Sequence, residues 1–316
     1  MRVAVLKGGS SLERGVSLRS AARVEDALGA LGHEPLGIDA GPDLVDRLRG
    51  ERPDAAFIAL HGPGGEDGTV QELLEILGLP YTGPGVAACA LCMDKVASKH
   101  EVRAAGLPTP DWAAFNATAF RELGAADTLE EIEARLGFPL VVKPASQGSS
   151  LGVEFAASRG EVPEALVAAF SYDDRVLLER YVKGRELAVG MLGSEPLPIV
   201  EAIPREEDFF SFEARYEIGR TTYVCPADLP DGEAEEIQSV AARTYETLGC
   251  SGFARVDLIL GDDGPQVLEV NAIPGLTDTS LFPMAAEAAG LSFEQTVERI
   301  VSLALERPGA GATLPA

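Results

Sequence analysis

The chain has 316 residues, 46% of them hydrophobic, which is enough to build a large core in two domains or three small ones. With 50 acidic and 26 basic residues, its formal net charge is −24. Phosphates of nucleic acids and anionic membrane surfaces would repel such a chain, so we expect it to bind neither. No apolar stretch reaches the roughly 18–20 residues that span a bilayer, and the four cysteines are too few for a disulfide scaffold. These features favour a cytoplasmic protein.

The first sixty residues alternate short apolar stretches with a helical pattern. We predict a helix at about 17–31 and strands at residues 3–6, 36–38 and 55–60. This alternation is typical of a parallel α/β sheet. The glycines after the first strand do not form the G-x-G-x-x-G pattern, so a dinucleotide-binding fingerprint is absent.

A glycine-rich loop, a helix and a boundary region follow the first sheet. The loop at 61–69, HGPGGEDGT, combines four glycines with a histidine and acidic residues, a composition that favours a site over a plain connection. A single helix is predicted at about 85–105, and Pro108 and Pro110 then interrupt the chain at a boundary region.

The remaining pattern changes to short strands separated by glycine turns, as in an antiparallel sheet. Strands are predicted at residues 140–143, 152–155, 176–179, 186–192, 253–260 and 266–270, with a hairpin turn at 261–264. Helices are predicted at about 232–248 and 292–306.

The strongest chemical signal is the C-terminal hairpin. Asp257 lies on its first strand, and Glu269 and Asn271 alternate on the second, so the latter two project to one face. Oxygen ligands of this kind suit Mg²⁺ with phosphate oxygens completing its coordination. Acids on a solvent-facing strand are the alternative, but the surrounding sequence VLEVNAIPG is apolar and favours a metal. Arg255 faces the same side as Asp257, an arrangement that suits an anionic transition state.

Three further segments suggest contacts with a nucleotide or a reacting carbonyl. Lys143 ends a strand before the loop QGSSLG, whose small residues can cradle phosphate, with Lys95 as a second cation. In the segment Glu179-Arg180-Tyr181-Val182, an aromatic ring and a strand edge can hold a base, and Glu186 can take ribose hydroxyls. A glycine at position 275 lets backbone N–H groups approach a reacting carbonyl closely.

Taken in order, these segments resemble the D-alanine–D-alanine ligases of the ATP-grasp superfamily from residue 1 to about 305. The matching motifs are HGPGGEDGTVQ (61–71), LPYTGPGV (79–86), MDK (93–95), VVKPASQGSSLGV (141–153), GFARVDLIL (252–260) and LEVNAIPGLTDTSLFP (268–283).

The resemblance implies a mixed α/β and α+β architecture, the ATP-grasp fold. It consists of an N-terminal parallel α/β domain (1–93), a central domain (94–180) and a C-terminal catalytic domain (181–316), the last two clamping ATP between antiparallel sheets. It further implies a homodimer that uses ATP and two Mg²⁺ ions, with Mn²⁺ as a substitute. The reaction joins two D-alanines through a D-alanyl phosphate for peptidoglycan precursor synthesis.

The resemblance also assigns roles to individual residues. ATP would be held by Lys95 and Lys143 at the phosphates and by Glu179, Tyr181, Val182 and Glu186 at adenine and ribose. The two metal ions would be bound by Asp257, Glu269 and Asn271. Arg255 and the N–H of Gly275 would hold the oxyanion, Ser280 and Leu281 the carboxylate of the second D-alanine, and His61 would lie near the first. Tyr216 and Ser149 would form a hydrogen-bonded pair that links a closing loop at about 205–220 to the site.

Two positions depart from the family pattern. In the segment Glu13-Arg14-Gly15-Val16-Ser17, Gly15 is expected to stand where the family has the glutamate that anchors the ammonium of the first D-alanine. Glu13, the nearest acid, or a water would then have to compensate, or binding of the first substrate would be weak. Arg215 stands where the family commonly has lysine, and it keeps the charge with a different geometry.

Two other functions stay open at this point. The first is a ligase with a changed donor or acceptor, such as D-lactate, D-serine or another amino acid. Gly15 keeps a changed donor open, whereas Tyr216 argues against the depsipeptide-forming branch, which tends to lack that tyrosine. A non-catalytic nucleotide-binding protein of the same fold is disfavoured because Arg255, Asp257, Glu269 and Asn271 are all present.

Overall fold

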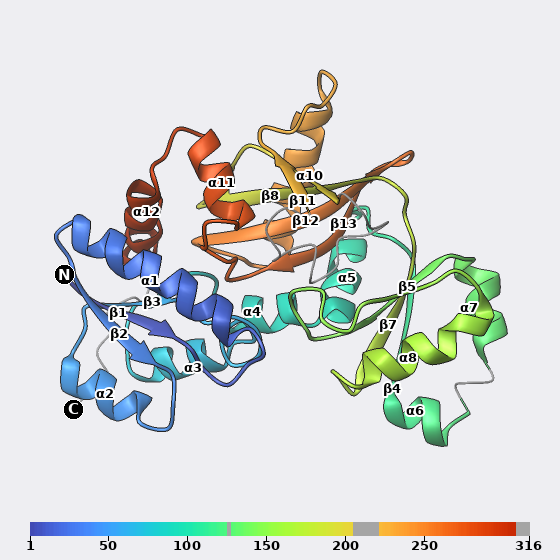
Figure 1. Cartoon of the computed structure of the whole chain (residues 1–316), viewed down its shortest axis with the longest axis horizontal. Helices are drawn as coiled ribbons and strands as arrows, with labels where there is room; N and C mark the ends of the chain where they lie inside the picture. Colours follow the sequence, from blue (N-terminus) through green and yellow to red (C-terminus); the bar gives the residue numbers. More distant parts are fainter. Residues whose placement is uncertain (125–127, 205–220, 308–316) are drawn as a thin grey trace.

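The computed structural model describes residues 1–124, 128–204 and 221–307. Three β-sheets organise this part of the chain, and Figure 1 shows the N-terminal and central sheets toward opposite ends of the long axis, with the third sheet between them.

The N-terminal sheet is parallel, as predicted. Its strand order is β2-β1-β3, formed by β1 (Arg2–Lys7), β2 (Glu34–Asp39) and β3 (Ala55–Ile58). Helix α1 (Arg14–Ala30) follows β1 and packs against it, and the C-terminal helix α12 (Phe293–Glu306) packs in turn on α1. The two ends of the described chain therefore meet at this sheet.

The central sheet is antiparallel in the order β4-β7-β5-β6. Its strands are β4 (Trp112–Asn116), β5 (Leu140–Pro144), β6 (Glu154–Ala156) and β7 (Arg175–Arg180). It has a hydrophobic core of its own, which includes Val142, Leu166 and Leu178.

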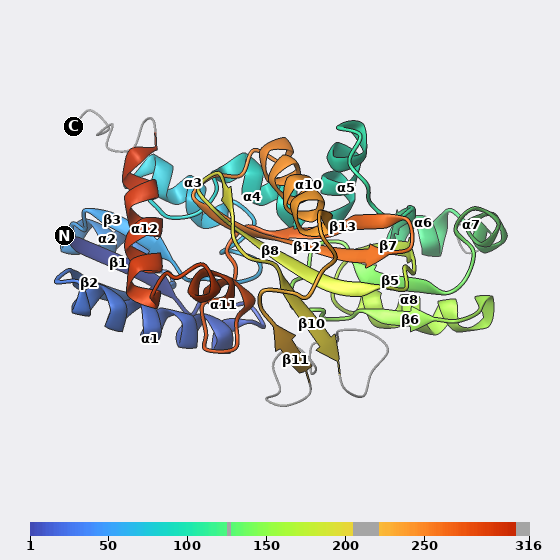
Figure 2. The ribbon, with the colours of Figure 1, turned by 90° about the horizontal axis from the view of Figure 1, so that it is seen from above.

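The C-terminal sheet is also antiparallel and runs β11-β10-β8-β12-β13, with β9 paired to β8. Its strands are β8 (Arg185–Leu192), β9 (Glu195–Pro196), β10 (Val200–Pro204), β11 (Thr221–Val224), β12 (Phe253–Gly261) and β13 (Gly264–Asn271). The predicted hairpin turn is confirmed, because Gly261 pairs with Gly264 across β12 and β13. One continuous core joins this sheet to the N-terminal one, from Val3 to Phe253 and Val301. Figure 2, seen from above, shows β12 and β13 extending from the N-terminal part toward the central sheet.

The other described helices are α2 (Leu44–Glu51), α3 (Thr69–Ile76), α4 (Val86–Met93), α5 (Lys95–Ala104), α6 (Ala117–Glu122), α7 (Leu129–Leu136), α8 (Val162–Phe170), α10 (Glu233–Thr247) and α11 (Leu281–Ala288), with a 3₁₀ turn at Arg159–Glu161. Helix α12 begins with a capping box. The Ser292 hydroxyl accepts a hydrogen bond from the Gln295 N–H, and the Gln295 side-chain oxygen accepts one from the Ser292 N–H. None of the helices in the described ranges is long and apolar enough to cross a membrane.

The single helix predicted at 85–105 is wrong, because the chain breaks into α4 and α5 at Asp94. Asp94 adopts an extended conformation, and its carboxylate accepts hydrogen bonds from the N–H groups of Val96 and Ala97, both at 3.0 Å. An aspartate in this conformation caps a new helix instead of continuing the old one. The break turns the first residue of α5, Lys95, toward the loop that follows β5, where its N–H bonds the carbonyl of Ala145.

Candidate active site

A deep pocket lies between the central and C-terminal antiparallel sheets. Strands β5, β6 and β7 line one side, and β8, β12 and β13 line the other. Nine of the residues predicted from the sequence to bind nucleotide, metal or substrate line it, namely Lys95, Lys143, Glu179, Tyr181, Val182, Glu186, Asp257, Glu269 and Leu281. The Tyr181 ring packs edge-on against Phe155 at 5.2 Å between centroids, so two aromatic rings line one end of the pocket.

A buried group of three charges lies at the wall of this pocket, and two of its members, Glu179 and Lys143, line it. The Glu179 carboxylate, 2% exposed, lies 2.7 Å from Nζ of Lys143 and 2.6 Å from Nζ of Lys99. Burial alone opposes ionisation of Glu179, but the charges of Lys143 and Lys99 outweigh it and hold the pKa of this carboxyl below its ordinary value. The two lysines therefore favour the ionised form of Glu179 at the pocket wall.

Lys99 was missed as a site residue by the sequence reasoning. Its ammonium is 2% exposed, and it also contacts the hydroxyl of Thr109 and, at 3.3 Å, the carbonyl of Pro110. Burial lowers the pKa of Lys99 to about 8 despite the attraction of Glu179. The available signal was spacing, because Lys99 follows Lys95 by four residues and shares its face of a helix.

Replacement of Glu179 by glutamine should destabilise the protein in a pH-dependent way. At pH 7 we expect a loss of roughly 3–5 kcal/mol, the usual cost of leaving buried charges unpaired. Folding lowers the pKa of Glu179 below its ordinary value of 4.5. The contribution of Glu179 to the free energy of unfolding is therefore complete above pH 4.5, and it is lost as the pH falls through the lowered pKa. Urea unfolding of both proteins at several pH values measures this, and a stability difference that stays constant down to pH 2 would show that Glu179 is not ionised in the folded protein.

The C-terminal hairpin brings the predicted metal residues together. Asp257 pairs with Glu269 across β12 and β13, and Arg255 pairs with Asn271. The Arg255 guanidinium donates to both carboxylate oxygens of Asp257, at 2.6 and 2.7 Å, and the Asn271 amide donates to the same carboxylate at 3.0 Å. Lys95 pairs with Glu269 at 3.1 Å and donates to the carbonyl of Gln147 at 2.6 Å. Each carboxylate thus faces a cation.

The side chains of this cluster offer oxygen ligands of the kind that Mg²⁺ prefers. Two carboxylates and one amide oxygen are the hard ligands that Mg²⁺ takes when phosphate and water fill the other positions. Within the ranges that the structure describes, no three His, Cys, Asp or Glu side chains group in a way that could hold a metal ion. The residues present therefore suit a metal that arrives with a phosphate-bearing ligand, and they do not form an all-protein cage.

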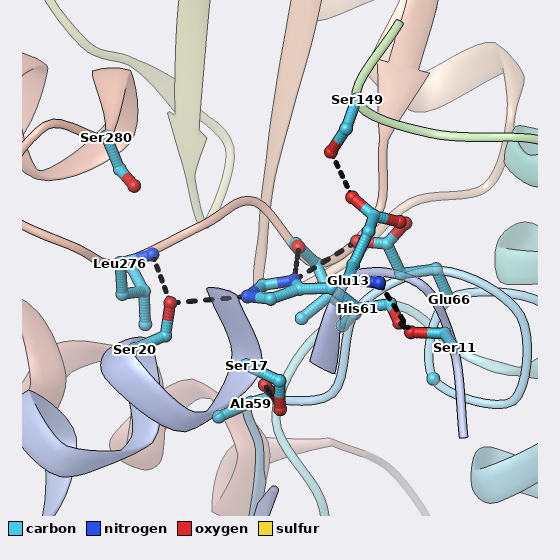
Figure 3. A network of polar contacts seen from close by, with 12 residues as sticks. Ser11, Glu13, Ser17, Ser20, Ala59, His61, Glu66, Ser149, Leu276 and Ser280 are labelled. Carbon is cyan, nitrogen blue, oxygen red and sulfur yellow. Dashed lines mark hydrogen bonds and ion pairs between the residues drawn. The ribbon is translucent and has the colours of Figure 1, made fainter. Parts of the chain in front are cut away.

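The expectation that Gly15 marks a missing anchor is wrong. A Cβ at position 15 would face the exposed side of α1, with Arg19 as its nearest neighbour at 3.7 Å. The buried acid is Glu13, whose carboxylate accepts a hydrogen bond from the Ser149 hydroxyl (Figure 3). Burial and the neighbouring Glu66 carboxylate raise the pKa of Glu13.

The carboxylate of Glu13 sits against two glycines in the adjacent loops. A Cβ at Gly62 would lie 2.6 Å from Oε2 of Glu13, and one at Gly148 would lie 2.9 Å from it. Ser149 itself adopts a left-handed backbone conformation with φ of 52°. The two glycines leave room for the Glu13 carboxylate, and Ser149 reaches it from an unusual backbone conformation. These features bring the surrounding loops together around Glu13.

The loop between β13 and α11 carries the remaining predicted substrate contacts. Ser280 precedes α11, and its hydroxyl accepts the N–H of Thr277 at 3.0 Å. Leu281, which lines the pocket, is the first residue of α11, where backbone N–H groups lack partners within the helix. Gly275 is tightly packed, since a Cβ there would lie 2.9 Å from the Ser280 hydroxyl. The predicted residues Arg215 and Tyr216 lie outside the described residues, as does the loop at 205–220.

The family models for the two parts of D-alanine–D-alanine ligases both match. The C-terminal one, "D-ala D-ala ligase C-terminus", covers residues 102–302, and the N-terminal one, "D-ala D-ala ligase N-terminus", covers residues 45–84. The chain belongs to the D-alanine–D-alanine ligase family.

Relatives and solved structures of the D-alanine–D-alanine ligase family match along almost the whole chain. The D-alanine–D-alanine ligase of Moorella thermoacetica is 45% identical over 314 residues, which cover 97% of this chain and 100% of that protein. That of Syntrophotalea carbinolica is 44% identical and covers 95% of both. The crystal structure of the Bacillus anthracis enzyme complexed with ATP matches with a TM-score of 0.82 at 34% identity, over 96% of this chain and 97% of that one. The predicted ATP-grasp architecture is thereby confirmed.

Proposed function

We propose that this chain joins two D-alanines to D-alanyl-D-alanine with consumption of ATP, in the cytoplasm and for peptidoglycan precursor synthesis. The observation that carries the proposal is the juxtaposition of an anion-binding cluster with a buried acid. Arg255, Asp257, Glu269 and Asn271 line up on one hairpin. Lys95 links Glu269 to the loop after β5, and Glu13 of the N-terminal part contacts Ser149 of the same loop. The hairpin residues can act on phosphate, and the Glu13 carboxylate can bind an amine.

In this proposal, ATP lies between the two antiparallel sheets. Tyr181 and Phe155 flank the adenine, Glu179 and Val182 accept and donate at its edge, and Glu186 takes the ribose. Lys143 and Lys95 bind the phosphates. The segments 94–180 and 181–316 act as the two clamping domains, and 1–93 supplies the first-substrate site. The continuous pocket lined by these residues supports this placement.

Asp257, Glu269 and Asn271 would hold two Mg²⁺ ions, or Mn²⁺ as a substitute, and the ions would neutralise the charge of the transferring phosphate. The oxygen donors and the apolar sequence around them support this assignment. Lys95 would then exchange its contact with Glu269 for a phosphate oxygen, since it already lines the pocket.

The reaction proceeds in two steps. A carboxylate oxygen of the first D-alanine attacks the γ-phosphorus, the bond to the β-phosphate oxygen breaks, and ADP leaves with an acyl phosphate behind. The amine of the second D-alanine then attacks the acyl carbon, loses a proton, and phosphate leaves with the original carboxylate oxygen. Arg255 and the N–H of Gly275 stabilise the tetrahedral oxyanion. Ser280 and Leu281 hold the carboxylate of the second D-alanine at the start of α11.

Glu13 serves as the anchor for the ammonium of the first D-alanine, with His61 beside it. The carboxylate pairs with that ammonium, and the Ser149 hydroxyl orients it. Arg215 and Tyr216 keep their proposed roles at the phosphate and in the closing loop on the strength of the resemblance alone. The resemblance also supports a homodimer, and the net charge of −24 argues against nucleic acid and membrane partners.

Substitution of Glu13 by glutamine should weaken the first substrate site selectively. A hydrogen bond to a charged group is worth roughly 1.5–3 kcal/mol, so we expect the KM of the first D-alanine to rise about 10–150-fold. The KM of the second D-alanine should stay within about threefold. Initial rates of ADP release against D-alanine concentration, fitted to two sites, measure both. Gly15→Glu is the matched control, because its side chain would point away from the site, and an improvement in that variant would contradict the placement of Glu13.

The proposed reaction is tested by ADP release across a panel of D- and L-amino acids and D-lactate, with the products identified by mass spectrometry. We expect D-alanine alone to support rapid turnover and D-alanyl-D-alanine to accumulate in equal amount to ADP. A depsipeptide or a mixed dipeptide as the main product would instead identify a ligase with a changed acceptor. ATP binding without turnover on any substrate would identify a non-catalytic member of the fold.

A further inference from the structure

Ser20, which has no role in the proposed reaction, and His61, which lies beside the first-substrate site, together hold the loop that carries Gly275. Ser20 lies on α1 and is fully buried, and its hydroxyl accepts the N–H of Leu276 at 3.1 Å. The same hydroxyl lies 3.3 Å from Nε2 of His61. On the other side of the ring, Nδ1 of His61 lies 3.0 Å from the carbonyl oxygen of Ile273 and 3.3 Å from Oε1 of Glu66 (Figure 3). Ser20 and His61 therefore contact the loop on both sides of Gly275.

The direction of these hydrogen bonds follows from chemistry. A carbonyl oxygen only accepts, so Nδ1 of His61 carries the proton and donates to Ile273. In a neutral imidazole Nε2 is then the acceptor, and the Ser20 hydroxyl must donate to it. That leaves the lone pairs of Ser20 for the N–H of Leu276. The Glu66 carboxylate is a second acceptor for the same Nδ1–H and favours the same tautomer, so these contacts support one arrangement of the loop.

These contacts fix the two peptide planes that flank the one containing the Gly275 N–H. The Ile273 carbonyl belongs to the plane before Pro274, and the Leu276 N–H belongs to the plane after Gly275. The plane between them contains the Gly275 N–H, and the ring of Pro274 restricts its rotation. Arg23, one turn beyond Ser20 on α1, adds a hydrogen bond to the Leu276 carbonyl at 2.7 Å. The N–H of Gly275 is thus held from both neighbouring planes.

We propose that Ser20 is a positioning residue, which acts through His61 and Leu276 to aim the Gly275 N–H at the oxyanion. This inference rests on the proposed function, because it assumes that Gly275 stabilises a tetrahedral intermediate. Donors of that kind act only when their geometry is set before the reaction, and a displacement of about 1 Å can cost about 100-fold in rate. His61 then serves the loop through both ring nitrogens.

Ser17 offers a matched control on the same helix. It is also fully buried, and its hydroxyl also accepts a backbone N–H, that of Gly8 at 2.8 Å, and donates to a carbonyl, that of Ala59 at 2.7 Å. These partners belong to the N-terminal sheet and its connections and not to the 273–276 loop. Ser17→Ala and Ser20→Ala remove the same group from the same kind of environment, so they should lower the melting temperature by similar amounts.

The two variants should differ in catalysis. For Ser20→Ala we expect kcat to fall about 10–100-fold, with the KM of ATP within about threefold. Affinity for a phosphinate analogue of the tetrahedral intermediate should fall by the same factor as kcat/KM. Ser17→Ala should retain kcat within about threefold. If Ser20→Ala does not fold, Ser20→Cys, which keeps a weak donor of similar size, should give an intermediate loss of kcat.

Two results would overturn the inference, and a third separates it from the proposed function. Equal kcat in the Ser17 and Ser20 variants shows that Ser20 has only a structural role. A Ser20 variant that loses ATP affinity but keeps kcat also contradicts it. If the unmodified chain makes no D-alanyl-D-alanine, the proposed function itself fails, whatever the variants do.

Discussion

Replacement of Glu269 by alanine is expected to abolish ATP turnover while leaving the fold intact. Glu269 lies opposite Asp257 on the hairpin, its carboxylate pairs with Lys95, and it is half-buried and lines the pocket. Loss of this charge removes one of only two carboxylates available to the proposed metal ions, and water cannot replace its charge. We expect kcat to fall at least about 1,000-fold, in the range seen when electrostatic stabilisation of a transition state is removed.

Two measurements make the Glu269 result specific. Circular dichroism and thermal unfolding should show a folded protein, and the Mg²⁺ concentration needed for half-maximal ATP binding should rise, which reports on the metal independently of turnover. Glu298→Ala is a suitable control, because Glu298 lies on α12 and its carboxylate pairs with His33 far from the pocket. Near-normal ADP release by a folded Glu269→Ala protein would remove Glu269 from the metal site.

The second large effect is expected at Arg255. Its guanidinium is 7% exposed and makes a two-pronged contact with Asp257, which fixes its orientation beside the site. Replacement by alanine should lower kcat roughly 100–1,000-fold, because a group that stabilises the oxyanion acts in the transition state more than in the ground state. The affinity for ATP should change much less.

The Arg255 prediction is checked by comparing kcat with the dissociation constant of ATP. Arg255→Lys keeps the charge but not the planar two-pronged contact, so it should recover only part of the rate. Loss of ATP binding with kcat preserved would make Arg255 a nucleotide ligand and contradict its role at the oxyanion.

The sequence was most informative where a pattern repeats in a regular element. The apolar stretches before residue 60 predicted a parallel sheet, and the alternation of Glu269 and Asn271 predicted their common face, because strand geometry fixes both. The hairpin turn at 261–264 was equally local. Residues on one strand pair can therefore be placed without the rest of the chain.

Two of the three errors concern contacts between distant segments, and the third concerns a local helix cap. The family pattern suggests that Gly15 marks a missing acid, but the acid that the loops at Gly62 and Gly148 enclose is Glu13. Lys99 resembled an ordinary helix residue until Glu179, 80 positions later in sequence, was placed beside it. Asp94 ended one helix and began another through a cap that apolar periodicity does not register.

The most direct test of the central claim follows the oxygen atoms of the first substrate. The chain is incubated with Mg²⁺, ATP and D-alanine labelled with oxygen-18 in its carboxylate, and phosphate and dipeptide are analysed by mass spectrometry. Attack of the carboxylate on the γ-phosphorus transfers one labelled oxygen to phosphate for each D-alanyl-D-alanine formed, and this is the result that we predict. Unlabelled phosphate accompanying dipeptide, or phosphate release without dipeptide, would contradict the acyl phosphate route and with it the account of the site.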